Sequence, residues 1–196
     1  AHRWMTYGVC SRFEKMSDAA LAAWAEILRR VPGARLTLND RALRRPDAIR
    51  RIQAAMPGIE SHRIQYAIDT NHPDHMLAYQ SVDLVLDPFP HTGGTSAMEQ
   101  LWMGVPVMTL YGQAVGERTT SSVLTAIGHP EWITHSVDEY IELAVKLAGR
   151  REQLAEARQT LRHEMEQSVL CNGTYVRAVE DAYRGMWQRW CDRGGA

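Results

Sequence analysis

Short β-rich runs alternate with helical patterns along most of this chain, and that alternation is the feature that most constrains its fold. The clearest run is Val82-Asp83-Leu84-Val85-Leu86. Largely apolar runs of this length are typical of strands that a parallel sheet buries on both faces. Strands that alternate with helices form βαβ units. The sequence therefore predicts an α/β fold built on a parallel sheet.

The expected elements follow one another without an internal repeat or a linker. Strands are expected at residues 5–10, 35–39, 63–68, 82–86, 106–110 and 132–134. Helices are expected at residues 17–30, 46–56, 73–79, 95–103 and 115–127, and beyond Ser136 with breaks near Gly149 and at 171–173. At 196 residues the chain is long enough for one domain, with a core over about residues 1–150 and C-terminal helices over residues 151–196.

The last helix, which Asn172 is expected to cap, carries one broad apolar and aromatic face. Such a face needs a partner surface, because large exposed apolar patches are uncommon on soluble domains. We expect it to dock on the core of this domain. The alternative is that part of it reaches across to a partner domain. The face consists of Tyr175, Val179, Ala182, Tyr183, Met186, Trp187 and Trp190.

Composition limits the classes of partner. Lys and Arg number 22 against 23 Asp and Glu, so no overall field attracts nucleic acid or an anionic membrane. No window approaches the ~18 apolar residues of a membrane span, and the N-terminal residues lack the pattern of a secretory signal. Three cysteines without a CxxC pair indicate neither a disulfide framework nor a zinc site. We therefore expect a cytoplasmic protein that binds phosphate through local groups and needs no metal.

A Gly-Gly pair stands directly before the helix expected from Thr95. In open parallel sheets, ligands bind beyond the carboxyl ends of the strands, where loops lead into helices. Glycines allow the backbone to approach an anion, and the first N–H groups of a helix carry partial positive charge. Gly93 and Gly94 therefore indicate a phosphate site, although the same pair also fits a tight turn without a ligand.

Ser96 and Glu99 allow two interpretations. Their spacing is that of a capping box, in which the hydroxyl accepts a backbone N–H and the carboxylate reaches back to the cap residue. Alternatively, Glu99 lies one turn inside the helix, where its carboxylate accepts hydrogen bonds from the hydroxyls of a ribose. The spacing alone does not decide between a cap and a ligand contact.

Two consecutive segments carry a longer pattern, Asp83-Leu84-Val85-Leu86-Asp87-Pro88-Phe89-Pro90 and Gly93-Gly94-Thr95-Ser96-Ala97-Met98-Glu99-Gln100-Leu101-Trp102-Met103-Gly104-Val105-Pro106-Val107. Together they resemble the donor-binding stretch of the O-linked N-acetylglucosamine transferases and their plant SPINDLY-type relatives. The resemblance extends over about residues 7–190. It implies a Rossmann-like, doubly wound parallel sheet, the C-terminal lobe of a two-lobed glycosyltransferase of the GT-B type. Further matching segments are residues 12–15, 23–28, 31–32, 74–76, 138–140, 143–144, 171–173 and 183–187.

The resemblance implies a role for each matching residue. Lys15 contacts the donor diphosphate and acts in catalysis, as a charge that stabilises the departing anion. His75 packs against the uracil ring. Thr95 and Ser96 bind phosphate oxygens, and Glu99 contacts the ribose. The implied donor site consists of Arg12, Lys15, His75, Gly93, Gly94, Thr95, Ser96 and Glu99.

Two residues depart from the pattern of the animal enzymes. Arg12 stands where those enzymes have glutamine, and Gly94 where they have histidine, so some contacts to the phosphates or the sugar must differ. The loop of residues 87–92 is closer to the plant and bacterial pattern. The implied donor is UDP-N-acetylglucosamine, with GDP-fucose as the alternative, and no cofactor beyond this substrate is implied.

The chain is long enough for the donor-binding lobe alone. The resemblance implies an N-terminal lobe, tetratricopeptide repeats and a protein acceptor as partners in the full protein. We therefore expect the nucleotide-sugar-binding lobe of a protein O-glycosyltransferase, inactive without its N-terminal lobe. A non-catalytic nucleotide-binding or interaction module with the same fold is the alternative from a different class.

Overall fold

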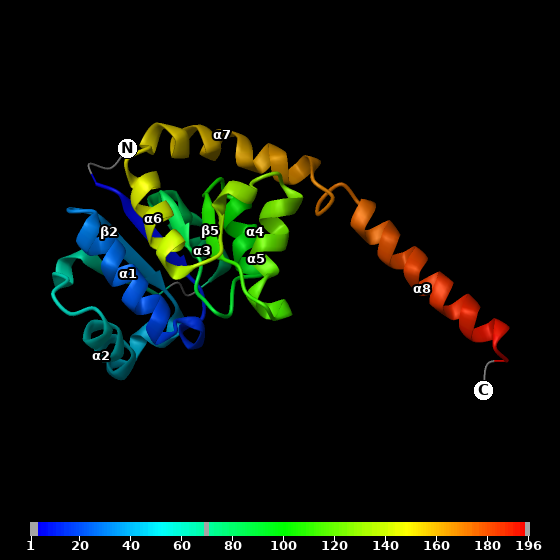
Figure 1. Ribbon diagram of the computed structural model, residues 1–196, viewed down its shortest axis with the longest axis horizontal. Coiled ribbons are helices and arrows are strands. Elements are labelled where there is room, and N and C mark those ends of the chain that lie inside the picture. Colours follow the sequence, from blue (N-terminus) through cyan, green and yellow to red (C-terminus); the bar gives the residue numbers. More distant parts are fainter. Residues whose placement is uncertain (1–3, 69–70, 195–196) are drawn as a thin grey trace.

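The computed structural model describes residues 4–68 and 71–194 of the chain. Six strands form one sheet in the order β3-β2-β1-β4-β5-β6, and the pairings among the described strands are all parallel (Figure 1). The expected α/β fold with a doubly wound parallel sheet is confirmed. Residues 1–3, part of the segment analysed for a secretory signal, lie outside the described residues. The strands are β1 (Thr6–Cys10), β2 (Arg35–Asn39), β3 (Ile64–Ala67), β4 (Leu84–Leu86), β5 (Val107–Leu110) and β6 (Ile133–Thr134).

Helices cover both faces of this sheet. Right-handed crossovers put α1 and α2 on one face and α3, α4 and α5 on the other, and α6 packs beside α1 (Figure 1). Among the described helices, none is both long and apolar enough to cross a membrane. The helices are α1 (Asp18–Arg30), α2 (Pro46–Ala55), α3 (His72–Ala78), α4 (Thr95–Trp102), α5 (Thr119–Ala126), α6 (Val137–Ala148), α7 (Arg151–Gln167) and α8 (Thr174–Asp192).

The helix expected at residues 115–127 is divided in the structure. A 3-10 turn, η5 (Val115–Glu117), precedes α5. The carboxylate of Glu117 accepts the N–H groups of Gln113 and Ala114 at 2.8 and 3.1 Å, which closes a turn at this point. Side chains that bond to nearby backbone compete with helix formation, and the apolar pattern of the sequence does not record such bonds.

Ser17 caps α1, as the sequence predicts. Its hydroxyl accepts the N–H of Ala20 at 3.1 Å and donates to the carbonyl of Phe89 at 2.5 Å. Phe89 lies in the loop that follows β4. One side chain therefore both starts α1 and joins that helix to the loop in which the candidate site was expected.

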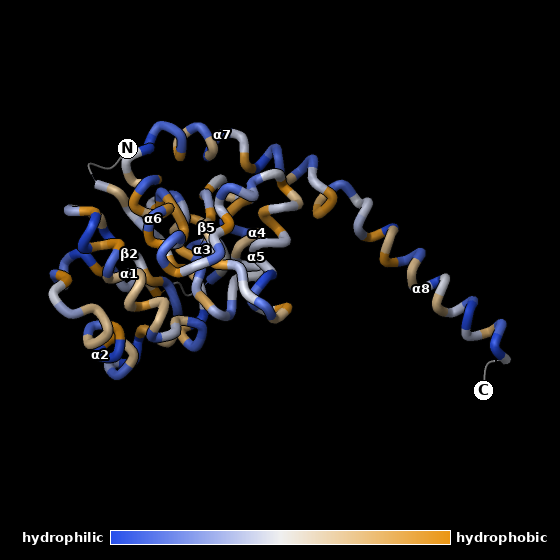
Figure 2. The backbone as a smooth tube through the Cα atoms, viewed as in Figure 1, coloured by the Kyte–Doolittle hydropathy of each residue, from blue (hydrophilic) through white to orange (hydrophobic). Residues whose placement is uncertain are grey.

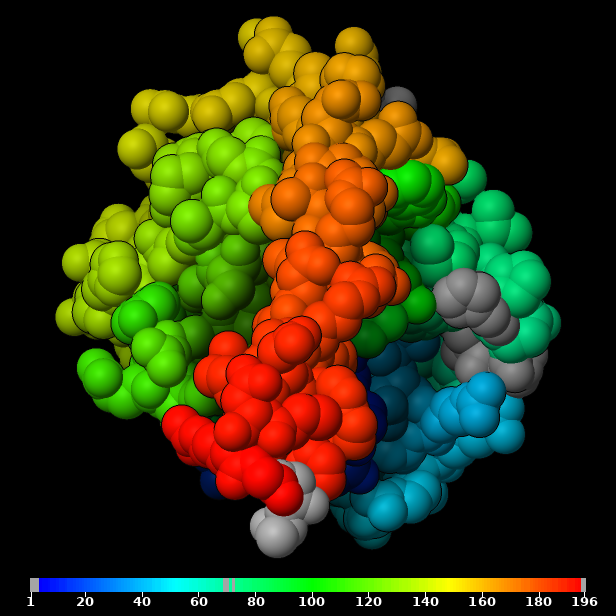
Figure 3. Space-filling model, turned by 90° about the vertical axis from the view of Figure 1, so that its right-hand side faces the viewer, coloured from blue at the N-terminus to red at the C-terminus, as the bar shows by residue number. Residues whose placement is uncertain are grey.

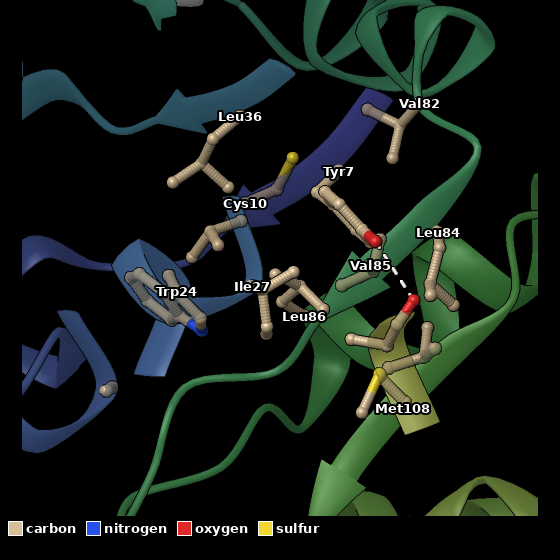
Figure 4. Close-up of a cluster of buried hydrophobic side chains, with 14 of the residues drawn as sticks. Tyr7, Cys10, Trp24, Ile27, Leu36, Val82, Leu84, Val85, Leu86 and Met108 are labelled. Carbon is tan, nitrogen blue, oxygen red and sulfur yellow. Dashed lines mark hydrogen bonds between the residues drawn. The ribbon is translucent and has the colours of Figure 1, made fainter. Parts of the chain in front are cut away.

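A chain of buried polar groups links the core to the carboxyl end of β4. The indole of Trp24 donates to the hydroxyl of Tyr140 at 3.2 Å, and that hydroxyl donates to the carbonyl of Asp87 at 2.9 Å. Tyr7 donates to the carbonyl of Ala144 at 2.9 Å, the bond that starts from Tyr7 in Figure 4. Helices α1 and α6 and the end of β4 are therefore fixed by directional bonds as well as by apolar packing.

The two C-terminal helices differ in how they pack. Helix α7 contacts α4 and buries Leu154, Leu161 and Met165. Helix α8 instead projects away from the sheet and its flanking helices (Figure 1) and lies in front of them in the view of Figure 3. None of the described residues of α8 is buried, and Trp187 is 64% exposed. The prediction that its aromatic face docks on the core of this domain is wrong.

A turn at residues 171–173 separates α8 from α7. Gly173, at the cap position, has φ of 78°, in the left-handed region that favours glycine. The prediction that Asn172 caps α8 is wrong by one residue, although the Asn172 side chain accepts the N–H of Thr174 at 3.0 Å. Hydrophobic and hydrophilic residues still alternate along α8 (Figure 2). Contact of its apolar face with a partner domain therefore stays a prediction.

We expect Gly8→Ala to destabilise the sheet. Gly8 lies in the centre of β1, paired with β2 and β4, and a Cβ atom there would lie 2.6 Å from Cγ1 of Val82. Val82 is buried beside β1 (Figure 4), so its side chain cannot withdraw without repacking. The free energy of unfolding should fall by about 1 to 3 kcal/mol in urea denaturation.

The matched control is Gly149→Ala. Gly149 is exposed and has αR geometry, and a Cβ atom there meets only the carbonyl of Lys146 at 3.5 Å. This variant should keep the parental stability or gain up to about 1 kcal/mol. Equal stability of the two variants would contradict the close approach at Gly8.

Candidate functional site

The sheet has a topological switch point between β1 and β4. The chain leaves β1 toward β2 on one side and leaves β4 toward β5 on the other. The loops that follow these two strands therefore diverge and leave a crevice, where α/β sheets bind ligands. A cavity of ≈ 660 Å³ lies there. It is lined by Cys10, Ser11, Arg12, Lys15, Asn39, Asp40, Arg41, Asn71, His75, Gly94, Thr95 and Ser96.

Most of the predicted donor-site residues meet in this cavity. Gly93 and Glu99 are not among its lining residues. Gly93 lies behind the lining, with its N–H directed to the carboxylate of Asp87, and Glu99 lies beside His75. The predicted residues that line the cavity are Arg12, Lys15, His75, Gly94, Thr95 and Ser96.

Lys15 connects the loop after β1 to the loop after β4. It ends the 3-10 turn η1 (Phe13–Lys15), and its amine donates to the carbonyl of Thr92 at 2.7 Å. Burial lowers the pKa of the Lys15 amine, the Asp87 charge raises it, and the Arg12 charge lowers it further. The amine is therefore held at one point of the cavity wall by a main-chain acceptor.

Asp87 is the main residue of this region to which the sequence analysis gave no role. It is 2% exposed. One carboxylate oxygen accepts the N–H of Gly93 at 2.8 Å, and the other accepts the hydroxyl of Thr109 at 2.8 Å. Burial raises the pKa of Asp87 to about 6, and the hydrogen bonds and the Lys15 charge oppose that shift. An acidic residue directly after a buried strand, at the ligand-binding edge of the sheet, was the signal in the sequence.

Helix α4 begins at Thr95, with Gly94 at the cap position and no side-chain cap. The capping-box interpretation of Ser96 and Glu99 is therefore wrong, because Ser96 is already the second helical residue. The first backbone bond of the helix runs from the N–H of Met98 to the carbonyl of Gly94 at 3.2 Å. The N–H groups before it carry the partial positive charge of a helix start, next to the cavity.

His75 and Glu99 come from different helices, α3 and α4. Their Nε2 and Oε2 atoms are 3.8 Å apart, and Nε2 of His75 also lies 2.7 Å from the hydroxyl of Tyr79. The imidazole lines the cavity, and Glu99 lies beside it. His75, predicted to contact the nucleotide base, and Glu99, predicted to contact the ribose, are therefore neighbours in the structure.

Several lining residues were missed because they follow other strands. Asn39, Asp40 and Arg41 come at the end of β2 and Asn71 comes after β3; their position at the carboxyl edge was the available signal. Asp40 is the one carboxylate among the described lining residues, and it accepts the N–H of Ala42 at 2.7 Å. The cationic side chains in the lining outnumber it, so the cavity favours an anion.

In the part of the chain that the structure describes, no group of three or more His, Cys, Asp or Glu side chains is placed to hold a metal ion. Several protein groups supply positive charge to the cavity. Those groups are the guanidinium groups of Arg12 and Arg41, the amine of Lys15 and the first N–H groups of α4.

Comparison with known proteins gives one consistent family. Residues 5–179 match glycosyl transferase family 41. A protein of Oryza sativa subsp. japonica described as a probable UDP-N-acetylglucosamine–peptide N-acetylglucosaminyltransferase SPINDLY is 37% identical, and the alignment covers 96% of this chain and 21% of that protein. The counterpart of Hordeum vulgare is 35% identical, with 96% and 20% covered. The chain thus spans about a fifth of the length of these curated relatives.

Solved structures agree with this match. A mutant of the Thermobaculum terrenum O-GlcNAc transferase is 31% identical, with a TM-score of 0.89. The match covers 98% of this chain and 38% of that one. TarM is 12% identical, with a TM-score of 0.64 over 90% of this chain and 36% of its own, and shows likeness of fold alone.

We expect Asp87→Asn to change how stability depends on pH. Burial raises the pKa of Asp87 from 3.8 to about 6, so between these values the folded chain keeps a proton that the unfolded chain has lost. The contribution of this group to the free energy of unfolding is therefore present in acid and falls as pH rises through that window, by about 3 kcal/mol in total. The amide of the variant does not titrate.

Urea denaturation at several pH values between 4 and 7 checks this expectation. The stability of Asp87→Asn relative to the parent should rise across the window and then level off. Asp138→Asn, at an exposed carboxylate of α6, is the control and should not show this rise. A difference between Asp87→Asn and the parent that stays constant with pH would contradict the buried titration.

Proposed function

Because the chain belongs to glycosyl transferase family 41, we propose that it is the donor-binding lobe of a two-lobed protein O-glycosyltransferase. The observation that carries the proposal is the cavity at the switch point, where Lys15 and the start of α4 line the same space. That space takes the diphosphate of a nucleotide sugar. The proposed donor is UDP-N-acetylglucosamine, which the names of the plant relatives contain, and GDP-fucose is the alternative.

In this proposal the diphosphate lies at the N-terminus of α4. Helix starts bind anions because their first N–H groups lack intrahelical partners and carry partial positive charge. The hydroxyls of Thr95 and Ser96 add hydrogen-bond donors, and Lys15 and Arg12 add positive charge around the same cavity. Gly94 allows the backbone to approach the anion closely.

The nucleoside extends toward α3. His75 lines the cavity and supplies a flat ring against which a base can stack. Glu99, 3.8 Å from Nε2 of His75, is the proposed acceptor of hydrogen bonds from the ribose hydroxyls, since an ionised carboxylate has two acceptor oxygens. With the capping box excluded, this ligand contact is the remaining interpretation of Glu99.

Lys15 is the proposed catalytic residue. When the sugar leaves, negative charge grows on the diphosphate, and a positioned cation stabilises this charge more in the transition state than in the ground state. The carbonyl of Thr92 already holds the amine, so little reorganisation is needed. We propose that this charge and the N–H groups of α4 act without a metal ion or a further cofactor.

The proposed partners are an N-terminal lobe and a protein acceptor, with tetratricopeptide repeats in the full protein. The relatives are much longer than this chain, and their names describe transfer to a peptide. The apolar face of α8, where Tyr183, Trp187 and Trp190 are exposed, is the proposed contact with the second lobe. The thiols of Cys171 and Cys191 are exposed and free, which supports a reducing, cytoplasmic location.

We expect Lys15→Ala to weaken nucleotide-sugar binding. Loss of a charge-assisted contact costs about 1.5 to 3 kcal/mol, so Kd should rise at least about tenfold. Calorimetric titration with UDP-N-acetylglucosamine, UDP and GDP-fucose measures this change and also identifies the donor. The control is Lys146→Ala, which changes the other lysine of the chain, exposed on α6. Unchanged affinity of Lys15→Ala would show that Lys15 does not contribute to nucleotide-sugar binding.

We expect this chain to transfer no sugar by itself and the two-lobed protein to be active. Holding donor and acceptor together contributes roughly 7 to 11 kcal/mol to catalysis, and the proposed acceptor wall belongs to the other lobe. Radiolabelled donor, assayed with both proteins and the same acceptor, gives the comparison. Transfer by this chain alone, at a rate near that of the two-lobed protein, would overturn the two-lobe proposal. Donor binding without transfer in either protein would favour a non-catalytic module.

A further inference from the structure

Asp87 makes none of the proposed donor contacts, yet its carboxylate lies directly behind them. We infer that Asp87 is a positioning residue for the donor diphosphate: it holds the turn of residues 92–95 so that the start of α4 and Lys15 act on one point of the cavity. The inference rests on the proposed function, because it names the group that organises the same site.

The first part of this role concerns the turn before α4. A carboxylate oxygen of Asp87 accepts the N–H of Gly93 at 2.8 Å. A Cβ atom on Gly93 would lie 3.0 Å from that oxygen and 3.2 Å from the Cβ of Ala97, so the turn is pressed against both the carboxylate and the first turn of α4. The N–H of Gly93 is bound inward, away from the cavity. The next two residues, Gly94 and Thr95, line the cavity.

The second part concerns Lys15. Its amine donates to the carbonyl of Thr92, the residue directly before Gly93. Thr92 is itself fixed, because its N–H and its hydroxyl both donate to the carbonyl of Gly116, at 3.1 and 3.0 Å. The residues that hold the amine and the turn are therefore neighbours in the chain. A shift of this turn would displace the cation and the helix start together.

The carboxylate is well fixed in turn. Its second oxygen accepts the hydroxyl of Thr109 on β5 at 2.8 Å, and the carbonyl of Asp87 accepts the hydroxyl of Tyr140 on α6 at 2.9 Å. Strand β5 and helix α6 thus both support the residue that supports the turn. Sites for charged ligands need such support, because a displacement of about 1 Å removes much of the value of a contact.

Stability does not explain a carboxylate at this position. Burial raises the pKa of Asp87 to about 6, so the fold disfavours its ionised form near neutral pH. A neutral side chain of similar shape would avoid that cost. Lys15 is the nearby cation that partly offsets it, and Arg12 acts on Lys15 in turn. A carboxylate that burial makes costly to ionise, yet that bonds to the turn behind a ligand cavity, is explained by the geometry of that turn.

The test separates the hydrogen bonds of Asp87 from its charge. Asp87→Asn removes the charge but keeps an oxygen for the N–H of Gly93 and an amide that can donate to Thr109. Asp87→Ala removes both carboxylate oxygens, so the N–H of Gly93 and the hydroxyl of Thr109 both lose their acceptor. Each variant of the 196-residue chain is titrated at pH 7 with UDP-N-acetylglucosamine, GDP-fucose and inorganic pyrophosphate, and circular dichroism checks that it is folded. For the sugar nucleotide that the parent binds, Kd should rise at least about tenfold in Asp87→Ala and less than about threefold in Asp87→Asn.

Gly93→Ala tests the same turn with the carboxylate intact, and it replaces Asp87→Ala if that variant does not fold. Its Cβ atom would push the turn away from Asp87, so we expect Kd to rise about tenfold. Asp138→Asn, at an exposed carboxylate on α6, should bind as the parent does. Amide resonances of residues 94–97 should shift in Asp87→Ala and stay near the parental positions in Asp87→Asn.

Two results would overturn the inference alone. The first is parental affinity in folded Asp87→Ala and Gly93→Ala, which would leave Asp87 with a structural role only. The second is equal weakening in Asp87→Asn and Asp87→Ala, which would assign the effect to charge and not to geometry. A parent chain that binds none of the three ligands would instead overturn the proposed function, and this inference with it.

Discussion

The buried carboxylate of Asp87 joins the core of this fold to its ligand-facing edge. On one side the main-chain carbonyl of Asp87 accepts a hydrogen bond from the hydroxyl of Tyr140, and that hydroxyl accepts one from the indole of Trp24. On the other side the carboxylate of Asp87 accepts hydrogen bonds from the N–H of Gly93 and the hydroxyl of Thr109. Helix α6, strands β4 and β5 and the turn before α4 therefore meet at one residue, and α1 is linked to it through Tyr140. The direction in which α4 presents its first N–H groups depends on these bonds, because Gly93 directly precedes the helix cap.

The cavity also shows why overall charge and local charge carry different information. The chain has a formal net charge of −1, which predicts no long-range attraction for an anion. The cavity nevertheless collects Arg12, Lys15 and Arg41 around a helix start, against Asp40 as the one carboxylate among the described lining residues. Charges interact strongly only within about 8 to 10 Å at physiological salt. A local cluster can therefore bind a diphosphate on a molecule without a net positive field.

How much the sequence could predict depends on what each pattern records. The apolar run at residues 82–86 records burial, so this strand and a site at its carboxyl end were predictable. The capping box was wrong because the start of α4 depends on the backbone at Gly94, which residue spacing does not record. Asp87 was visible as an acidic residue after a buried strand. The bonds of Asp87 to Gly93 and Thr109 could not be seen in the sequence. The bond to Thr109 and the burial of Asp87 arise from contacts between separate segments of the fold.

The same limit applies to α8. Helical periodicity recorded an apolar face but not the surface that covers it. Isolated helices are marginal in water because their nucleation is unfavourable, and α8 buries none of its described residues. Trp187 and Trp190 stack on each other with centroids 5.0 Å apart, which shields only part of each ring. The cavity at the switch point is formed within this chain, whereas none of the described residues buries the apolar face of α8, and the proposed acceptor wall belongs to the other lobe. In the proposed two-lobed protein, one lobe packed against α8 would cover the aromatic face and supply the acceptor wall, so both features would have a single physical origin.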